Sequence, residues 1–370
     1  MTMATAVSAC FVRAGRVGGA EHALYNLLDG LRAVTAADPW SVVTASPLQA
    51  GFDLAPLVTR PVHVPGLRNR VAIETLALPA LRGVDRWLLP NYYTPVGLRG
   101  HVVTVIHDAQ HEHFPENFSA RKRRWLQAAH RYTMRRADVV VAISDYVAAD
   151  LIARHGDRYV SKVRVIPNAV SFDRLEPGVL PRAVPRDREI VLCVSGGYRH
   201  KNLETLVRAF AEVAARRPDS QLVVVGQAPE LLLGARQGAG VGSMVRALSL
   251  TDRVTVLGYV TDAELGALYR ATSVLAMPSL FEGFGLPVVE ALGLGVPVVS
   301  TRAGSLADVS LGLARYIDDP TNAAEMANAL IEVLGAGVQA RPSAADVERV
   351  RARYDPQHVA RLFAVAVNEA

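Results

Sequence analysis

Two glutamates that lie eight residues apart in the segment SLFEGFGLPVVEALGLGVPVV have the types and spacing of a ligand site. Glu282 stands just before a turn in which Gly285 permits a tight backbone, and Pro287 suits the first turn of a helix. A helix is therefore predicted from about Leu286, with Glu290 on it. Because the first amides of a helix attract anions, this segment predicts a site suited to a diphosphate.

A second cluster is basic, since the segment SGGYRHKN follows a predicted strand at 190–194. Gly196 allows the chain to turn, and Arg199 and Lys201 then place two cations at the carboxyl end of that strand. Arginine offers a planar fork for phosphate oxygens and lysine a compact charge, so the pair is suited to hold a leaving diphosphate without a metal ion. Asn202 is predicted as the N-cap of the helix that follows.

The first half of the chain carries further candidates. Gly18 and Gly19 would let the backbone approach a ligand where a helix starts, and His107 follows a predicted strand, a position from which a side chain can reach a ligand. His111 and His113 lie nearby, but HDAQHEH lacks the HExxH spacing of zinc proteases, so no metal site is predicted. No GxGxxG motif directly follows a predicted strand, which argues against a dehydrogenase.

The elements that must position these residues are short β-branched runs that alternate with helical patterns. This alternation predicts parallel sheets covered on both faces, an α/β fold. The predicted strands are 6–11, 41–45, 86–89, 102–106, 139–143, 163–166, 190–194, 222–225, 254–257, 274–277 and 296–300, with helices at 20–32, 120–136 and 146–154 among others.

The pattern stops once and then restarts, which predicts two consecutive doubly wound, Rossmann-like domains. The first is expected over 1–170 and is expected to be completed by a C-terminal helix at 355–370. The second is expected over 189–354, and a Pro-, Arg- and Asp-rich connection joins them at 171–188. Because ligands bind beyond the carboxyl ends of such strands, the domains are expected to face each other across a cleft.

Composition narrows the class of protein. The 370 residues include 40 Lys and Arg against 35 Asp and Glu, a net charge of +5 that favours anionic partners. Two isolated cysteines, a first apolar run without a preceding cation and the lack of a long apolar stretch predict a cytoplasmic protein. The basic stretch from Arg121 to Arg136 predicts either a solvated helix face or peripheral contact with anionic lipid, and nucleic acid is not an expected partner.

Taken together, these segments resemble the family-4 retaining glycosyltransferases of GT-B fold over nearly the whole chain. EGFGLPVVEALGLGVPVV is similar to the E-x7-E segment of that family, and GGAE, AISDY, VIPNAV and YRHKN agree with it in order and spacing. HDAQHEHFPENFS resembles a stretch of bacterial mannosyl- and rhamnosyltransferases of polysaccharide assembly. One departure is Asp308 in SLADVSLG, where relatives often carry a glutamate.

The resemblance implies a role for each candidate. Arg199 and Lys201 would bind the donor diphosphate, Glu290 the ribose hydroxyls and Glu282 the donor sugar, while His107 would touch that sugar near its reacting face. The amides around Phe284 to Leu286 and the loops at Gly18, Gly19 and Gly196 would complete the donor contacts. Catalysis would then be electrostatic, with the acceptor hydroxyl delivered on the face of the leaving group and no protein general base.

The same resemblance implies a metal-independent hexosyl or deoxyhexosyl transfer from a nucleoside diphosphate sugar, with GDP-mannose favoured over UDP- and dTDP-sugars and no cofactor. A glycan or lipid-linked acceptor is expected, and a small soluble or natural-product acceptor is the alternative. Three rivals use the same fold: a nucleotide-sugar epimerase, a pyridoxal phosphate-dependent phosphorylase and a non-catalytic nucleotide-sugar-binding scaffold. A turnover assay separates the scaffold from the enzymes.

Overall fold

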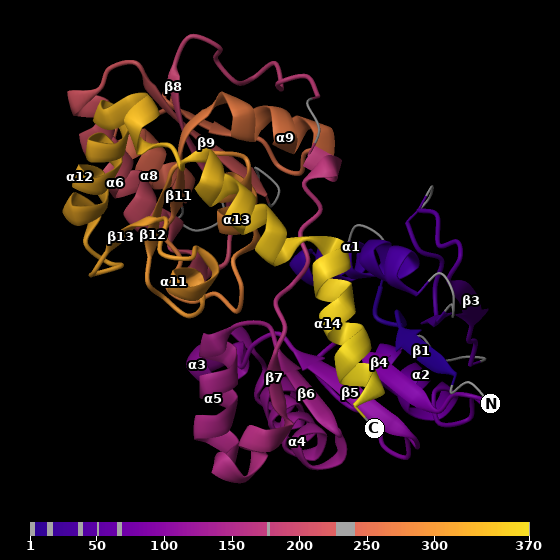
Figure 1. Cartoon of the computed structure of the whole chain (residues 1–370). Helices are drawn as coiled ribbons and strands as arrows, with labels where there is room; N and C mark the ends of the chain where they lie inside the picture. The colour runs from indigo at the N-terminus through magenta and orange to yellow at the C-terminus, as the bar shows by residue number, and fades with distance from the viewer. Residues whose placement is uncertain are drawn as a thin grey trace. The chain divides into compact units, whose positions relative to one another are not determined.

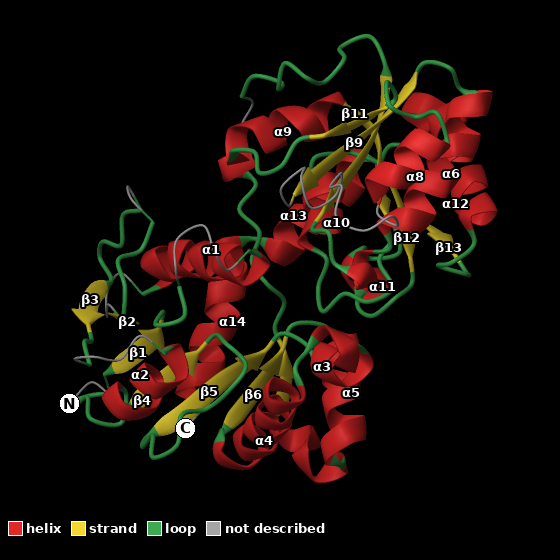
Figure 2. Cartoon of the chain, turned by 180° about the vertical axis from the view of Figure 1, so that it is seen from behind, coloured by secondary structure: helices red, strands yellow, loops and turns green. Residues whose placement is uncertain are grey.

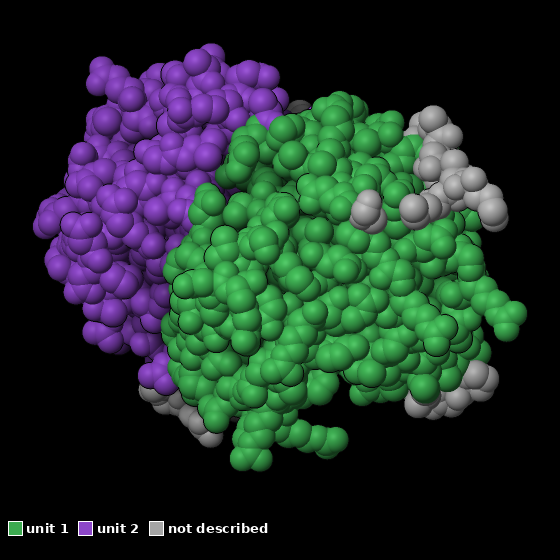
Figure 3. All heavy atoms as spheres, turned by 60° about the horizontal axis from the view of Figure 1, so that its bottom comes forward, with its two compact units in different colours: residues 1–170, 353–370 green, residues 171–352 purple. Residues whose placement is uncertain are grey.

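The chain divides into two compact units in its computed structural model, which describes residues 4–12, 18–35, 40–49, 52–64, 69–175, 178–226 and 241–369. Unit 1 comprises Met1–Val170 together with Arg353–Ala370, and unit 2 comprises Ser171–Ala352 (Figure 3). The connection predicted at 171–188 therefore lies within unit 2, and the predicted C-terminal helix lies within unit 1.

Unit 1 is built on a parallel sheet of seven strands in the order β3-β2-β1-β4-β5-β6-β7. Strands such as β5 and β6 are buried along almost their whole length, which is why the sequence shows continuous apolar runs there. The strands are β1 (Thr5–Ser8), β2 (Ser41–Thr44), β3 (Val58–Pro61), β4 (Arg86–Leu89), β5 (His101–Ile106), β6 (Val139–Ala142) and β7 (Val163–Val165). Strand β3 is largely exposed, lies at the edge of the sheet and ends at a proline, so the sequence pattern does not predict it.

Helices from both ends of the chain cover this sheet. The helices of unit 1 are α1 (Gly19–Val34), α2 (Arg70–Ala77), α3 (Gln110–His113), α4 (Ala120–Arg136), α5 (Asp145–His155) and α14 (Pro356–Asn368). Helix α14, yellow in Figure 1, packs against α1 and against β4 and β5. Gly30 allows this contact, since a Cβ atom there would lie 2.0 Å from the Pro356 carbonyl oxygen.

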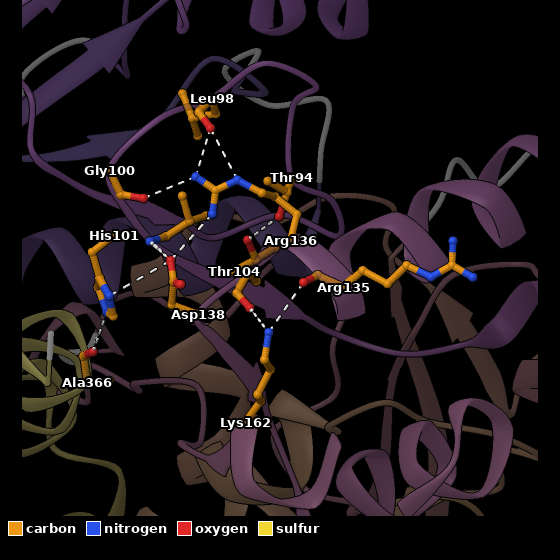
Figure 4. A network of polar contacts seen from close by, with 12 residues as sticks. Thr94, Leu98, Gly100, His101, Thr104, Arg135, Arg136, Asp138, Lys162 and Ala366 are labelled. Carbon is orange, nitrogen blue, oxygen red and sulfur yellow. Dashed lines mark hydrogen bonds and ion pairs between the residues drawn. The ribbon is translucent and has the colours of Figure 1, made fainter. Parts of the chain in front are cut away.

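A polar network ties the C-terminal end of α4 to the start of β5 and to α14 (Figure 4). The Asp138 carboxylate accepts a hydrogen bond from the Val102 amide at 2.8 Å, and the Arg136 guanidinium donates to the carbonyl oxygens of Leu98 and Gly100 at 2.8 and 3.0 Å. His101 lies between Asp138 and the backbone of α14. Arg136 therefore stabilises the fold of unit 1 and is not available as a free surface cation.

Unit 2 contains a parallel sheet of six strands in the order β10-β9-β8-β11-β12-β13. Its strands are β8 (Glu189–Ser195), β9 (Ser220–Gly226), β10 (Val254–Val256), β11 (Thr272–Met277), β12 (Val298–Thr301) and β13 (Arg315–Ile317). The sequence pattern predicts each of these strands except β13, a short strand at the edge of the sheet. In both sheets the first strand in sequence is central, so the strand order reverses beside β1 and beside β8. Both units therefore contain Rossmann-like, doubly wound sheets.

The helices of unit 2 are α6 (Leu203–Arg216), α8 (Val241–Ala247), α9 (Asp262–Ala271), α10 (Leu286–Gly293), α11 (Leu306–Val309), α12 (Ala323–Ala336) and α13 (Ala344–Tyr354), the last of which ends in unit 1. Helices α6, α8 and α12 pack together on one face of the sheet (Figure 2), where they share a core with β8, β9 and β11. Leu206 and Phe210 of α6 are fully buried in it, as their helical spacing predicted. This packing fixes the start of α6, and with it the basic turn that precedes the helix.

Candidate functional site

The two chemical segments of unit 2 meet at the point where the strand order reverses. Strands β8 and β11 are neighbours, with Leu192 opposite Leu275, so the loops that follow them leave the sheet side by side. The loop after β8 contains the basic turn Arg199–Lys201, a 3-10 helix, and the loop after β11 contains Glu282. Ligands of doubly wound sheets bind at this kind of switch point.

Lys201 and Glu282 form an ion pair between these two loops. The Lys201 Nζ lies 2.7 Å from Oε1 and 2.9 Å from Oε2 of the Glu282 carboxylate. The Ser279 hydroxyl donates a third hydrogen bond to Oε1 at 2.7 Å. The lysine side chain keeps 20% of its surface exposed and the glutamate 11%, so the pair is largely desolvated but accessible to a ligand.

The backbone around Glu282 is held by the loop that follows β12. The Ser305 amide donates to the Glu282 carbonyl at 3.0 Å, and the Ser305 hydroxyl donates to the carbonyls of Glu282 and Phe284 at 3.1 and 2.9 Å. Gly304 has a φ of +63°, and a Cβ atom there would lie 2.2 Å from the Glu282 carbonyl oxygen. Three loops therefore fix the position of this one carboxylate.

Asn202 occupies the N-cap position of α6, as predicted, but its side chain does not cap the helix backbone. It has left-handed backbone geometry with a φ of +56°, and its side chain accepts no hydrogen bond from a backbone amide of the helix. Its Oδ1 accepts one from the Thr205 hydroxyl at 2.7 Å instead. Its amide group donates to the carbonyl oxygens of Pro278 and Pro320 at 3.0 and 2.7 Å. The Asn202 side chain therefore ties the start of α6 to the loops that contain Pro278 and Pro320.

The start of α10 lies where the glycine and proline pattern predicted it. Gly285 precedes the helix with a φ of +98°, Leu286 is its first residue, and Pro287 lies in the first turn. A Cβ atom at Gly285 would lie 2.7 Å from a methyl group of Leu306, so the position has no room for a side chain. The Phe284 side chain is 5% exposed and belongs to the core, which leaves the backbone of this turn as its polar surface.

Glu290 is not bonded to the Lys201–Glu282 pair. Its carboxylate forms a short ion pair with Arg174 and accepts a hydrogen bond from the Tyr269 hydroxyl at 2.8 Å. Arg174 also pairs with Asp262 at 2.6 Å. Burial, together with the Glu290 charge, raises the pKa of Tyr269 well above its ordinary value, so this hydroxyl stays a hydrogen-bond donor. Glu290 thus belongs to a second polar cluster, with Arg174, Tyr269 and Asp262. Glu290 lies on helix α10, whereas Glu282 lies in the loop before it.

The remaining unit 2 candidates are solvent-facing. The Arg199 side chain is exposed and, among the described residues, has no hydrogen bond or ion pair. Gly196 lies at the turn after β8, where the Ser195 hydroxyl donates to its carbonyl oxygen at 3.1 Å. Asp308 lies in α11 and is exposed. The structure therefore joins Lys201 to Glu282 but leaves Arg199 and Asp308 at the surface.

The unit 1 candidates lie at the ends of β1 and β5. His107 is 8% exposed, and its Nε2–H donates to the Pro90 carbonyl at 3.0 Å. Burial lowers the pKa of His107, so its imidazole is neutral at pH 7. Gly18 has a φ of +63° and precedes Gly19, the first residue of α1. The residues from 13 to 17 of the same predicted loop lie outside the described part of the chain.

His111 and His113 pair with separate groups. His113 Nε2 lies 3.0 Å from an Asp150 carboxylate oxygen, whereas the ring of His111 is edge-on to that of His130, with centroids 4.8 Å apart. In the part of the chain that the structure describes, no group of three or more His, Cys, Asp or Glu side chains is arranged to hold a metal ion.

Two largely buried charged residues, Arg174 and Glu74, were not predicted as site residues from the sequence. Arg174 lies in a segment that was interpreted as a connection, yet it is the partner of Glu290. In unit 1, the buried Glu74 carboxylate is bonded to the Tyr93 hydroxyl in a short contact and to Arg70 at 3.2 Å. Neither Arg174 nor Glu74 stands in a motif, so only the three-dimensional arrangement identifies them.

The basic helix α4 is exposed along its first turns, where Arg121, Lys122 and Arg124 face solvent and Trp125 is 37% exposed. No described helix is both long enough and apolar enough to cross a membrane.

Two family models together match most of the chain. Residues 17–174 match the model described as Glycosyltransferase Family 4, and residues 181–344 match the model described as Glycosyl transferases group 1. The boundary between the two matched regions lies close to the boundary between unit 1 and unit 2.

Curated relatives are similar over shorter stretches. A D-inositol 3-phosphate glycosyltransferase of Corynebacterium jeikeium is 33% identical over 46% of this chain and 42% of the relative. That of Corynebacterium urealyticum is 27% identical over 78% of this chain and 70% of the relative. A 2-deoxystreptamine glucosyltransferase of Streptomyces kanamyceticus is 31% identical over 56% of this chain and 54% of the relative. The matched region thus spans only about half the length of most of these relatives.

Among solved structures, Anabaena Alr3699/HepE in complex with UDP and glucose is similar over 100% of both chains, with a TM-score of 0.75 and 19% identity. At this identity the likeness concerns the fold. It agrees with the two parallel sheets of unit 1 and unit 2.

Proposed function

Because the chain belongs to the glycosyltransferases that combine a Family 4 domain with a group 1 domain, we propose that it transfers a sugar from a nucleoside diphosphate donor to an acceptor hydroxyl. The observation that carries this proposal is the Lys201–Glu282 pair, which is held by three loops at the switch point of unit 2. A cation and a carboxylate side by side are suited to a diphosphate and to sugar hydroxyls, respectively.

In the proposed donor complex, Lys201 and Arg199 bind the diphosphate, and Glu282 accepts hydrogen bonds from the sugar. The backbone at Gly196 and from Phe284 to Leu286 supplies amide donors to the phosphates. Arg199 is suited to this role because its exposed side chain is not engaged by another described residue.

Glu290 is proposed to accept hydrogen bonds from the ribose hydroxyls. Arg174 and Tyr269 each bind one oxygen of its carboxylate, but a carboxylate has about four acceptor positions, so two hydroxyls can still be bound. Arg174 would then act as a positioning residue, since it orients the carboxylate without touching the donor.

The proposed reaction retains the anomeric configuration and uses no metal ion. The bond between the anomeric carbon and the departing phosphate oxygen breaks, and a bond from the acceptor oxygen forms on the same face. The acceptor proton moves to the departing diphosphate. Lys201 and Arg199 stabilise the negative charge that develops there, which is electrostatic catalysis by preorganised groups. His107, with Gly18 and Gly19, is proposed to contact the sugar from unit 1.

Two nucleotide-sugar donors are proposed. The sequence analysis favours GDP-mannose, whereas the structurally similar Anabaena protein was solved with UDP and glucose. We would titrate the protein with GDP-mannose, UDP-glucose, dTDP- and ADP-sugars and follow the thermal midpoint, since a ligand that binds the folded state raises it. A shift with one base supports the proposal and identifies the donor class. A folded protein that shifts with none of them contradicts the proposal and favours a protein that does not bind nucleotide sugars.

Two acceptor classes are proposed. The resemblance to polysaccharide-assembly enzymes favours a glycan or lipid-linked acceptor. The similarity to a 2-deoxystreptamine glucosyltransferase favours a small natural-product acceptor as the alternative. A lipid-linked acceptor would fit a cytoplasmic protein that contacts the membrane. The proposed contact is made by Arg121, Lys122, Arg124 and Trp125. Co-sedimentation with anionic vesicles tests this contact, and an unchanged result for Arg121→Ala/Arg124→Ala would argue against it.

A further inference from the structure

Unit 1 contains a pocket that none of the proposed donor or acceptor roles involves. It lies between α3, α4, α5 and the 3-10 helix Asp157–Lys162, and it encloses about 410 Å³. Four arginines line it: Arg131 and Arg135 from α4, Arg154 from α5, and Arg158 from the 3-10 helix. Glu112 is the acidic side chain among the residues that line it.

Three of these arginines are not neutralised. The side chains of Arg131, Arg135 and Arg158 form no hydrogen bond or ion pair with another described residue, whereas Arg154 is bound to Asp150 at 2.9 Å. Glu112 accepts a hydrogen bond from Gln127 at 3.2 Å and lies 4.0 Å from Arg154, so it does not neutralise Arg131, Arg135 or Arg158. An excess of positive charge therefore remains at the mouth of the pocket.

Two neighbouring arginines at the C-terminal end of α4, Arg135 and Arg136, have different surroundings (Figure 4). Arg136 is committed to the carbonyls of Leu98 and Gly100, as described above. The neighbouring Arg135 accepts a hydrogen bond from Lys162 at its own carbonyl, while its guanidinium points away from the network (Figure 4). Adjacent arginines thus serve different purposes, and the fold does not require the Arg135 charge.

The inner wall of the pocket contains an unsatisfied polar atom. His130 is 2% exposed, and its Nε2 has no hydrogen-bond partner among the described residues. Burial, with help from His111, His155 and Arg154, lowers the pKa of His130 to about 3, so the ring is neutral. An unpaired buried nitrogen costs free energy. An unpaired His130 Nε2 in the same pocket as three arginines without acidic partners in the described part of the chain favours a binding site for a polar ligand.

We propose that this pocket binds the phosphate or diphosphate group of a small phosphorylated molecule. Arginine guanidinium groups match phosphate oxygens in geometry, and several of them together favour a multiply charged anion over a carboxylate. The volume exceeds that of one phosphate and falls in the usual range of small-molecule sites, so the anion is expected on a larger molecule. The proposal does not depend on transferase activity, because none of the residues proposed to contact the donor lines this pocket.

The test is calorimetric titration of the full chain with inorganic pyrophosphate at constant ionic strength. All proteins carry Arg199→Ala/Lys201→Ala, which removes the two cations of the donor loops as a competing site. We expect Arg131→Ala/Arg135→Ala to weaken pyrophosphate binding by roughly tenfold or more. The matched control is Arg82→Ala/Arg99→Ala, which removes the same charge from exposed positions of unit 1 outside the pocket, and it should stay within about twofold.

Two further arms distinguish the source of the phosphate. Binding of glucose 1-phosphate that is lost in Arg131→Ala/Arg135→Ala supports a soluble phosphorylated ligand. Binding to phosphatidylcholine vesicles that requires phosphatidic acid and these same arginines supports a lipid head group. Equal weakening of pyrophosphate binding by the pocket variant and by the control, or no measurable binding by the parent protein, would overturn the proposal.

Discussion

At the scale of single residues, substitutions of Lys201 and Glu282 are expected to reduce the transfer rate most strongly. Lys201→Ala and Glu282→Ala are each expected to lower the transfer rate about 10²- to 10³-fold, because each removes a preorganised group from the reacting centre. Steady-state kinetics with circular dichroism as a folding check would measure this. Glu204→Ala, an exposed change in the first turn of α6, is the control and should keep normal turnover. Near-normal turnover in either active-site variant would remove that residue from the mechanism.

A second prediction at this scale concerns metal ions. Since Arg199 and Lys201 supply positive charge at the proposed diphosphate site, transfer should proceed at an unchanged rate in excess chelator. The measurement is the initial rate after chelation and after re-addition of Mg²⁺ or Mn²⁺. A strict requirement for a divalent ion would contradict the proposed role of the two cations.

Arg174 gives a stability prediction. Its ion pair with Glu290 is nearly buried, with 15% and 5% of the two side chains exposed. Arg174→Ala should lower the free energy of unfolding by about 3 kcal/mol or more, since an uncompensated charge stays buried. Arg315→Ala, which breaks the exposed pair with Glu332, should cost less than about 1 kcal/mol. Urea unfolding followed by circular dichroism measures the free energy of unfolding of both variants. An equal decrease in the two would show that burial of the ion pair does not determine its contribution to stability.

At the scale of secondary-structure elements, two helical glycines should respond to alanine with opposite signs. Gly30 of α1 has no space for a Cβ atom, which would meet the Pro356 carbonyl of α14 at 2.0 Å. Gly30→Ala should therefore destabilise unit 1 by about 1–3 kcal/mol, despite the better helix propensity of alanine. Gly335→Ala in α12 meets nothing closer than 3.9 Å and should stabilise unit 2 by about 0.5–1 kcal/mol.

Thermal and urea unfolding of the two variants would decide between packing and propensity. Stabilisation by both substitutions would mean that α14 can move away from α1 at little cost. Destabilisation by both would mean that the end of α12 has a constraint beyond its nearest contacts.

The same scale explains which elements the sequence could predict. The central strands were predicted because burial on both faces produces unbroken β-branched runs. The edge strand β3 was missed because it is exposed and ends at a proline, features that sequence patterns associate with loops. Asn202 was predicted at the N-cap position because capping propensity is local, but its side-chain partners Pro278 and Pro320 could not be predicted, since the sheet brings them to it.

At the scale of the whole molecule, unit 1 should be the acid-sensitive part of the chain. Burial lowers the pKa of His107, His111, His130 and His155, all in unit 1, below the ordinary value of 6.5. The unfolded chain therefore binds more protons than the folded chain below about pH 6.5, so stability falls as the pH drops. For His130, whose pKa is lowered to about 3, the loss is about 1.4 kcal/mol per pH unit.

Tryptophan fluorescence reports on this directly, because Trp40, Trp87 and Trp125 all belong to unit 1. Urea unfolding in phosphate-free buffer should show a lower stability at pH 5.5 than at pH 7.5. In His130→Gln the difference between the two pH values should shrink, whatever the absolute stability of the variant. A variant that keeps the full pH dependence would show that His130 is not the responsible group.

The sequence by itself determined the two parallel sheets, the turn before α10 and the positions of Lys201 and Glu282 near strand ends. These features follow from local physical preferences: apolar periodicity, glycine at strained backbone angles and proline in a first helical turn. Only the tertiary structure decided that Glu290 pairs with Arg174, that Arg136 is structural and that Arg135 is not. Those outcomes depend on which loops the strand order brings to one edge of a sheet, and partners distant in the chain leave no trace in local sequence.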